Sequence, residues 1–149
     1  MNRSDKFLLR QIKYLQENPV EYAVFKWDVS NLRHLTVLIK GPPDSFYENG
    51  DFELEFIIPE SYPSSKPICR MIIPIFHPDI DGVISLPILY SDMFFIVTIP
   101  QIVEAIIEAL RHPDPSNPQN PMAAGLLLRN VNAFKEEVHR RIMANKLNL

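Results

Sequence analysis

The segment at 41–54 reads Gly41-Pro42-Pro43-Asp44-Ser45-Phe46-Tyr47-Glu48-Asn49-Gly50-Asp51-Phe52-Glu53-Leu54. Apolar residues alternate before it at Leu35, Val37 and Ile39, and polar and apolar residues alternate strictly over 51–56. A period of two predicts half-buried antiparallel strands on both sides. The connection at 44–50 is too long for a two-residue hairpin, and its Asn and Gly residues indicate an ordered wide turn.

The segment before these strands has the period of a helix. Its apolar residues recur at helical spacing, Ser4 is a plausible N-cap and Asn18-Pro19 a stop, which together predict a helix over 5–17. The residues that carry this pattern are Leu8, Ile12 and Leu15.

After the turn, 68–73 is apolar enough to predict a more fully buried strand, whereas 77–97 shows no period. An irregular segment of this length inside a compact domain is usually functional. Helical spacing returns over 99–110, 123–128 and 131–142. Because strands and helices are segregated along the chain, we expect an α+β domain with an antiparallel sheet.

Length and composition limit the class of protein. The 149 residues predict one domain over 1–149, and the net charge of −3 with scattered basic residues argues against nucleic-acid binding. The longest apolar run is too short to cross a membrane. The lone Cys69 and an N-terminus without a secretion signal favour the cytoplasm or the nucleus. Neither metal-ligand spacing nor a glycine-rich phosphate loop occurs, so we expect no metal and no cofactor.

Several motifs occur in an order that resembles the ubiquitin-conjugating enzyme family. They are the segment at 41–54, then Pro59-x-x-Tyr62-Pro63-x-x-x-Pro67, His77-Pro78-Asp79-Ile80, Gly82-Val83-Ile84-Ser85-Leu86-Pro87-Ile88-Leu89 and Pro113-Asp114-Pro115-Ser116-Asn117-Pro118-Gln119-Asn120. The resemblance implies a UBC-like fold: an N-terminal helix, a four-stranded antiparallel meander, a long active-site-like loop segment and C-terminal helices. It places the candidate site at Ser85, at His77, Pro78 and Asp79, and at Asn117.

Three departures from the family pattern meet in that site. The position of the family's ubiquitin-accepting cysteine is taken by Ser85, whose hydroxyl is a poor nucleophile at neutral pH. The family's His-Pro-Asn signature ends here in Asp79, a carboxylate with no N–H donor for an oxyanion. Asn117 stands where the family often has an acidic or hydroxyl residue, and an amide does not accept a proton. A hydrolase triad of Ser85, His77 and Asp81 is disfavoured, because the Gly-x-Ser-x-Gly elbow is missing.

The resemblance also implies partner faces. Lys6 and Arg10 match basic positions that face the activating enzyme, although a solvated charged face explains them equally simply. Ser64, Phe94, Phe95 and Ile96 occupy the loops on which ligases dock in the family. The last three form either an exposed apolar patch or a segment folded onto the core.

Three functions remain open. The first is a catalytically inactive module that binds ubiquitin, a ubiquitin-like protein, an activating enzyme, an active conjugating enzyme or a ligase non-covalently. The second is a genuine conjugating enzyme whose catalytic cysteine has been replaced by Ser85. The third is a scaffold subunit of a larger assembly.

Overall fold

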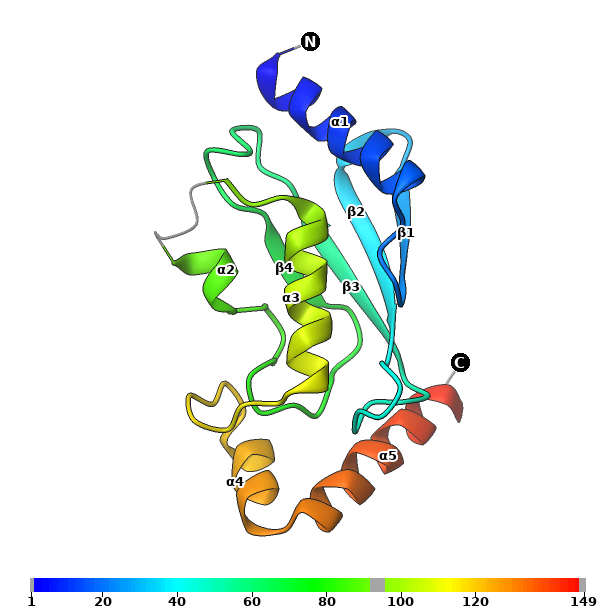
Figure 1. Ribbon diagram of the computed structural model, residues 1–149, viewed down its shortest axis with the longest axis vertical. Coiled ribbons are helices and arrows are strands. Elements are labelled where there is room, and N and C mark those ends of the chain that lie inside the picture. Colours follow the sequence, from blue (N-terminus) through cyan, green and yellow to red (C-terminus); the bar gives the residue numbers. More distant parts are fainter. Residues whose placement is uncertain (1, 92–95, 148–149) are drawn as a thin grey trace.

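The computed structural model describes residues 2–91 and 96–147. An N-terminal helix precedes a four-stranded antiparallel sheet, and the other helices follow the sheet along the chain (Figure 1). This order confirms the predicted α+β architecture. Within the described ranges, no helix is both long enough and apolar enough to cross a bilayer.

Helix α1 spans Arg3–Glu17 and begins two residues earlier than predicted. Its N-cap is Asn2, so the expectation of Ser4 is wrong. The Asn2 side chain accepts from the backbone N–H of Asp5 at 2.8 Å, and the Asp5 carboxylate accepts in return from the Asn2 N–H. This reciprocal pair satisfies two helix-end donors, which Ser4 could not do from inside the helix. The predicted end at Asn18 is confirmed.

The sheet is a meander in the order β1-β2-β3-β4. Its strands are β1 (Ala23–Asp28), β2 (Asn31–Lys40), β3 (Asp51–Ile57) and β4 (Ile68–Met71). Val37 pairs with Leu54, and Leu54 pairs with Met71, so the inward-facing residues form continuous rows across the sheet. A strand is present as predicted, but it ends at Met71 and not at residue 73, and the prediction that it is more fully buried is wrong. Only Cys69 and Met71 are buried, whereas Ile68 is 53% exposed.

The wide turn between β2 and β3 is ordered, as predicted. The Gly41 N–H donates to the Gly50 carbonyl at 2.8 Å and closes the turn. Tyr47 is fully buried and its hydroxyl donates to the Phe76 carbonyl at 2.7 Å. Gly41 is required here, because a Cβ at this position would overlap the Tyr47 carbonyl oxygen. The turn therefore fastens the sheet to the segment that leads into the candidate site.

Four helices follow the sheet: α2 (Pro87–Tyr90), α3 (Ile99–Arg111), α4 (Pro121–Arg129) and α5 (Val131–Leu147). The last three confirm the predicted helices, whereas α2 lies inside the segment for which the sequence showed no period. Helix α3 lies across the sheet in Figure 1, and its buried face contributes Ile99, Ile102, Val103, Ile106, Ile107 and Leu110 to the core. Helix α5 docks through Phe134, whose ring packs edge-on against Phe46 at 5.1 Å.

Candidate functional site

His77 is the most constrained polar residue of the candidate site. It is fully buried, and its ring stacks on Tyr47 at 5.2 Å between centroids. Its Nε2 lies 2.7 Å from the Ala109 carbonyl on α3, and its Nδ1 lies 3.1 Å from the Asp79 backbone nitrogen. Both ring nitrogens therefore face partners within the protein, and neither is available for proton transfer to a substrate.

Asp79 turns its carboxylate toward His77. Its Oδ1 lies 2.5 Å from His77 Nδ1 and is buried, with no other hydrogen-bond partner among the described residues. The negative charge of Asp79 contributes, after burial, to raising the pKa of Tyr47 well above its ordinary value. The Oδ1 of the Asp79 carboxyl group thus contacts His77 inside the loop and does not face solvent.

The stretch that carries Ser85 is docked on the edge of β4. The Met71 N–H donates to the Gly82 carbonyl at 2.9 Å, and the Ile84 N–H donates to the Cys69 carbonyl at 2.8 Å. Gly82 has a positive φ of 60°, which suits glycine at the bend before this docking. After the bend the side chains alternate, so Ile84 and Leu86 are buried while Ser85 between them is exposed.

Ser85 has no activating base among the described residues. Its hydroxyl makes no hydrogen bond to any residue in the described part of the chain. His77, the nearest histidine in the sequence, is engaged at both nitrogens, and Asp81 is exposed without a partner among the described residues. The arrangement therefore excludes the hydrolase triad considered above, because no histidine links Ser85 to a carboxylate.

Cys69 cannot act in place of Ser85. Its side chain is 1% exposed and belongs to the core face of β4. Burial raises the pKa of the Cys69 thiol well above its ordinary value, so the thiol is protonated and shielded. The only cysteine of the sequence is a core residue.

The loop before α4 contacts the His77 loop through the backbone. The Pro78 carbonyl accepts from the N–H groups of Gln119 at 2.8 Å and Asn120 at 3.0 Å. The Asn120 side chain in turn caps α4 by accepting from the Ala123 N–H. Asn117 is exposed in this loop. Hydrogen bonds thus join the loop of His77 and Pro78 to the loop before α4, whereas the Ser85 stretch is bonded to β4.

Comparison with known proteins identifies the fold family. The family model described as ubiquitin-conjugating enzyme matches residues 7–142, which is most of the chain. The chain belongs to the ubiquitin-conjugating enzyme family. The match includes most of α1, the sheet, the Ser85 stretch and most of α5, so the predicted resemblance is confirmed.

Three relatives within the ubiquitin-conjugating enzyme family illustrate the similarity. The ubiquitin-conjugating enzyme E2 pex4 of Dictyostelium discoideum is 37% identical over 83% of this chain and 85% of its own. The protein PEROXIN-4 of Arabidopsis thaliana is 38% identical over 70% of this chain and 63% of its own. The ubiquitin-conjugating enzyme E2 N of Drosophila melanogaster is 35% identical over 83% of this chain and 81% of its own.

The predicted partner faces of this family member are solvent-accessible where they are described. Lys6 and Arg10 are exposed on α1, and Ser64 is exposed in the loop between β3 and β4. Ile96 is 61% exposed just before α3. Phe94 and Phe95 lie outside the described residues. The roles of these residues stay predictions.

Gln11 is a structural residue that the sequence analysis missed. It lies on the buried side of α1, where it is 7% exposed. Its Oε1 accepts from the Ile99 N–H at 2.9 Å and lies 2.9 Å from the Tyr62 hydroxyl, so it links α1 to the start of α3. The signal in the sequence was a polar residue beside Ile12 on an otherwise apolar helix face.

Within the described ranges, no group of three or more His, Cys, Asp or Glu residues is placed to hold a metal ion.

Proposed function

We propose that this chain is a ubiquitin-conjugating-enzyme-like protein that does not form a thioester and instead binds ubiquitin, a ubiquitin-like protein or a conjugation partner non-covalently. One observation carries the proposal. Ser85 occupies the position that the resemblance assigns to the acceptor cysteine, and it is exposed with no base hydrogen-bonded to it in the described structure. The scaffold is retained while the nucleophile is lost.

The chemistry explains why this substitution matters. For Ser85 to accept ubiquitin, its oxygen must attack the thioester carbonyl on the activating enzyme, its proton must pass to a base, and the enzyme's thiolate must leave. A serine hydroxyl needs a positioned base to do this at neutral pH. His77 is engaged at both nitrogens, and the Asp79 carboxylate is turned to His77. Asn117 carries an amide, which does not take a proton.

The outer face of the sheet offers a surface for non-covalent binding. Val24 pairs with Leu38 across β1 and β2, and Ile57 pairs with Ile68 across β3 and β4. Ile57 and Ile68 are both exposed and lie side by side on adjacent strands, whereas the exposed Val24 lies on β1, two strands away from Ile57. Exposed apolar residues on adjacent strands are a typical feature of protein interaction sites. We propose that ubiquitin or a ubiquitin-like protein docks on this face.

Further partners follow from the family. We propose that Lys6 and Arg10 face an activating enzyme or an active conjugating enzyme, and that Ser64, Phe94, Phe95 and Ile96 belong to a ligase-type face. The lone buried Cys69 fits a reducing compartment, and we propose the cytoplasm or the nucleus as the location.

The proposal is tested by titrating ¹⁵N-labelled ubiquitin with this protein in the absence of activating enzyme and ATP. The expected result is a saturable set of chemical-shift changes that Ile68→Lys abolishes, because a charge then replaces the exposed apolar side chain. Val29→Lys is the matched control, since Val29 is 95% exposed at the turn between β1 and β2. If neither ubiquitin nor any ubiquitin-like protein in a panel shifts, the proposed binding function is wrong.

The second candidate is a conjugating enzyme whose catalytic cysteine has been replaced. It is favoured by the relatives, two of which carry the name ubiquitin-conjugating enzyme E2 at 35% and 37% identity. Under this candidate, Ser85→Cys would accept ubiquitin as a thioester in the presence of activating enzyme and ATP. If the chain neither binds nor accepts ubiquitin, the third function, a scaffold subunit of a larger assembly, is the one that remains.

A further inference from the structure

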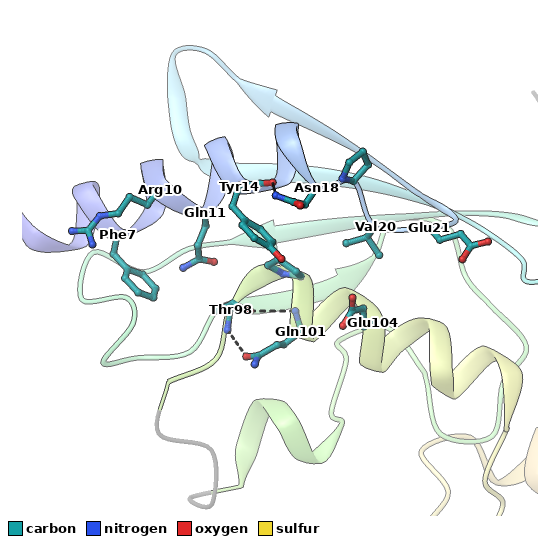
Figure 2. A pocket seen from close by; sticks show the side chains of 12 residues that line it. Phe7, Arg10, Gln11, Tyr14, Asn18, Val20, Glu21, Thr98, Gln101 and Glu104 are labelled. Atoms are coloured by element: carbon teal, nitrogen blue, oxygen red, sulfur yellow. Dashed lines mark hydrogen bonds between the residues drawn. The ribbon is translucent and has the colours of Figure 1, made fainter.

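A groove of about 640 Å³ lies between α1 and the start of α3, in a part of the molecule that carries none of Ser85, His77 or Asp79 (Figure 2). Its apolar walls include Phe7 and Tyr14 from α1 and Pro100 from α3. Tyr14 is 55% exposed, so its ring is accessible to a ligand in the groove.

The Gln11 amide lines this groove with an unsatisfied donor. Its Nε2 is buried and has no hydrogen-bond partner among the described residues, although the residue is more than nine-tenths buried. Figure 2 shows the amide in the space between α1 and Thr98, with its nitrogen on the side of Phe7. A buried donor without an acceptor costs free energy, so an acceptor supplied from outside would be favoured at this point.

The orientation of this amide is fixed by its neighbours. The Ile99 N–H lies 2.9 Å from Oε1 and needs an acceptor there. If Oε1 and Nε2 of Gln11 exchanged places, the Nε2 donor would face the Ile99 N–H, which is also a donor. The Tyr62 hydroxyl does not decide the orientation, because it can donate to the Val97 carbonyl at 2.7 Å in either case. The atom left without a partner is therefore the donor, and the missing group is a hydrogen-bond acceptor such as a peptide carbonyl.

The two ends of the groove carry opposite charges. Arg10 lies at the Phe7 end, and Glu21 and Glu104 lie at the Val20 end (Figure 2). All three side chains are exposed and form no ion pair within the described part of the chain. A ligand with a cation at one end and an anion at the other would match this distribution.

We propose that the groove binds an extended segment of a partner protein, about five residues long, with an acidic residue at one end, apolar residues in the middle and a lysine or arginine at the other end. The lining residues of α1 and its C-cap run from Phe7 to Asn18. The eleven steps between them rise by about 16 Å, which an extended peptide covers with about five residues at roughly 3.3 Å each. Gln11 Nε2 then donates to a backbone carbonyl of the segment. The site shares Arg10 with the proposed face for an activating or conjugating enzyme, but it requires neither chemistry at Ser85 nor binding of ubiquitin.

The test uses three capped peptides and the full-length ¹⁵N-labelled protein. Asp-Leu-Ala-Leu-Lys carries the proposed pattern, Asp-Leu-Ala-Leu-Asp replaces the cation with an anion, and Asp-Ser-Ala-Ser-Lys removes the apolar centre. The expected result is a saturable shift of the Gln11 side-chain amide signals. The first peptide should bind about fivefold more tightly than the second, the upper range for one exposed ion pair, and more tightly than the third, which buries less apolar surface.

Two variants locate the binding site. Glu104→Lys is expected to abolish the preference for the lysine-ended over the aspartate-ended peptide, because it leaves Glu21 as the single anion beside a new cation. Glu136→Lys, the same charge change on α5, leaves the preference unaltered. Gln11→Glu keeps an acceptor for the Ile99 N–H but removes the donor, and it is expected to weaken binding while the thermal midpoint shows that the protein remains folded. The proposal is overturned if the Gln11 signals do not move with any peptide. It is overturned equally if Glu104→Lys leaves the preference for the lysine-ended peptide at its full size, which would show that the charges of the groove do not select the ligand.

Discussion

His77 Nδ1 lies 2.5 Å from Asp79 Oδ1, while Nε2 of the same ring lies 2.7 Å from the Ala109 carbonyl. The carbonyl only accepts, so Nε2 must donate to it. In a neutral ring, Nδ1 then carries no hydrogen and has a lone pair. The Asp79 backbone N–H already donates to this lone pair at 3.1 Å. The buried carboxylate oxygen therefore meets a lone pair unless a proton lies between the two atoms. An asparagine, which the family has here, supplies that proton from its own side chain.

Asp79→Asn is expected to stabilise the protein by about 1 kcal/mol at pH 7, the net contribution of one satisfied hydrogen bond. The amide nitrogen of Asn can donate to Nδ1, whereas the carboxylate cannot. Chemical denaturation measures the difference, and Asp81→Asn, an exposed position in the same loop, is the control. A loss of stability in Asp79→Asn would instead show that an ion pair with a protonated His77 holds the loop.

Glu137 should contribute to stability in a pH-dependent way. Hydrogen bonds from Arg140 and then Arg141 lower the pKa of its carboxyl group to about 2. A group with a lowered folded-state pKa adds stability above its unfolded value of about 4.5, and this contribution is lost as the pH falls toward 2. Because the arginines are largely exposed, Glu137→Gln should cost only about 0.5 kcal/mol at pH 7.

The measurement is urea denaturation of Glu137→Gln and wild type at pH 7 and at pH 2.5, with Glu136→Gln as the unpaired neighbour. The difference for Glu137 should shrink at the lower pH and in high salt. A difference that grows on acidification would contradict the ion-pair assignment.

Cys69 should be inert toward thiol reagents in the folded protein. Its side chain is buried and burial raises the pKa of its thiol, so the reactive thiolate is scarce. With Ellman's reagent at pH 8, wild type should react only after denaturation, and Ser85→Cys should release one rapid equivalent from its exposed new thiol. Rapid reaction of the wild type would mean that β4 opens readily at this position.

Phe134 should be the residue that anchors α5. Its ring is fully buried and lies 5.1 Å from Phe46 and 5.6 Å from Phe76. Phe134→Ala removes a large core side chain and should cost about 4 kcal/mol in the free energy of unfolding. Leu128→Ala is the control, since Leu128 is 72% exposed on α4 and should change stability by less than about 0.5 kcal/mol. Equal effects of the two substitutions would show that α5 does not depend on this cluster.

Periodicity predicted most of the fold because it reports burial directly. The alternation around Val37 and Leu54 and the helical spacing of α3 both appear in the core as expected. It failed where a short hydrogen-bonded pair overrides the pattern, as with Asn2 and Asp5 at the start of α1. It also failed at β4, where only alternate residues face the core, so the apolar Ile68 is exposed.

The candidate site was predictable in its residue types but not in its contacts. The motifs located His77, Asp79 and Ser85, but the position of the His77 ring, which the Asp79 carboxylate faces, depends on Ala109 in a distant helix. The donor of Gln11 could not be predicted either, because its unsatisfied state depends on Ile99 and Tyr62 from two other segments.

The central claim is that position 85 does not accept ubiquitin, and charging assays test it most directly. Wild type and Ser85→Cys are incubated with activating enzyme, ATP and ubiquitin, alongside an active conjugating enzyme, and are analysed by non-reducing gel and intact mass. The same assay is repeated with ubiquitin-like proteins and their own activating enzymes. The account predicts that neither form gains a modifier. A thiol-sensitive conjugate on Ser85→Cys, or a base-labile ester on the wild type, would contradict it and establish a conjugating enzyme with a substituted nucleophile.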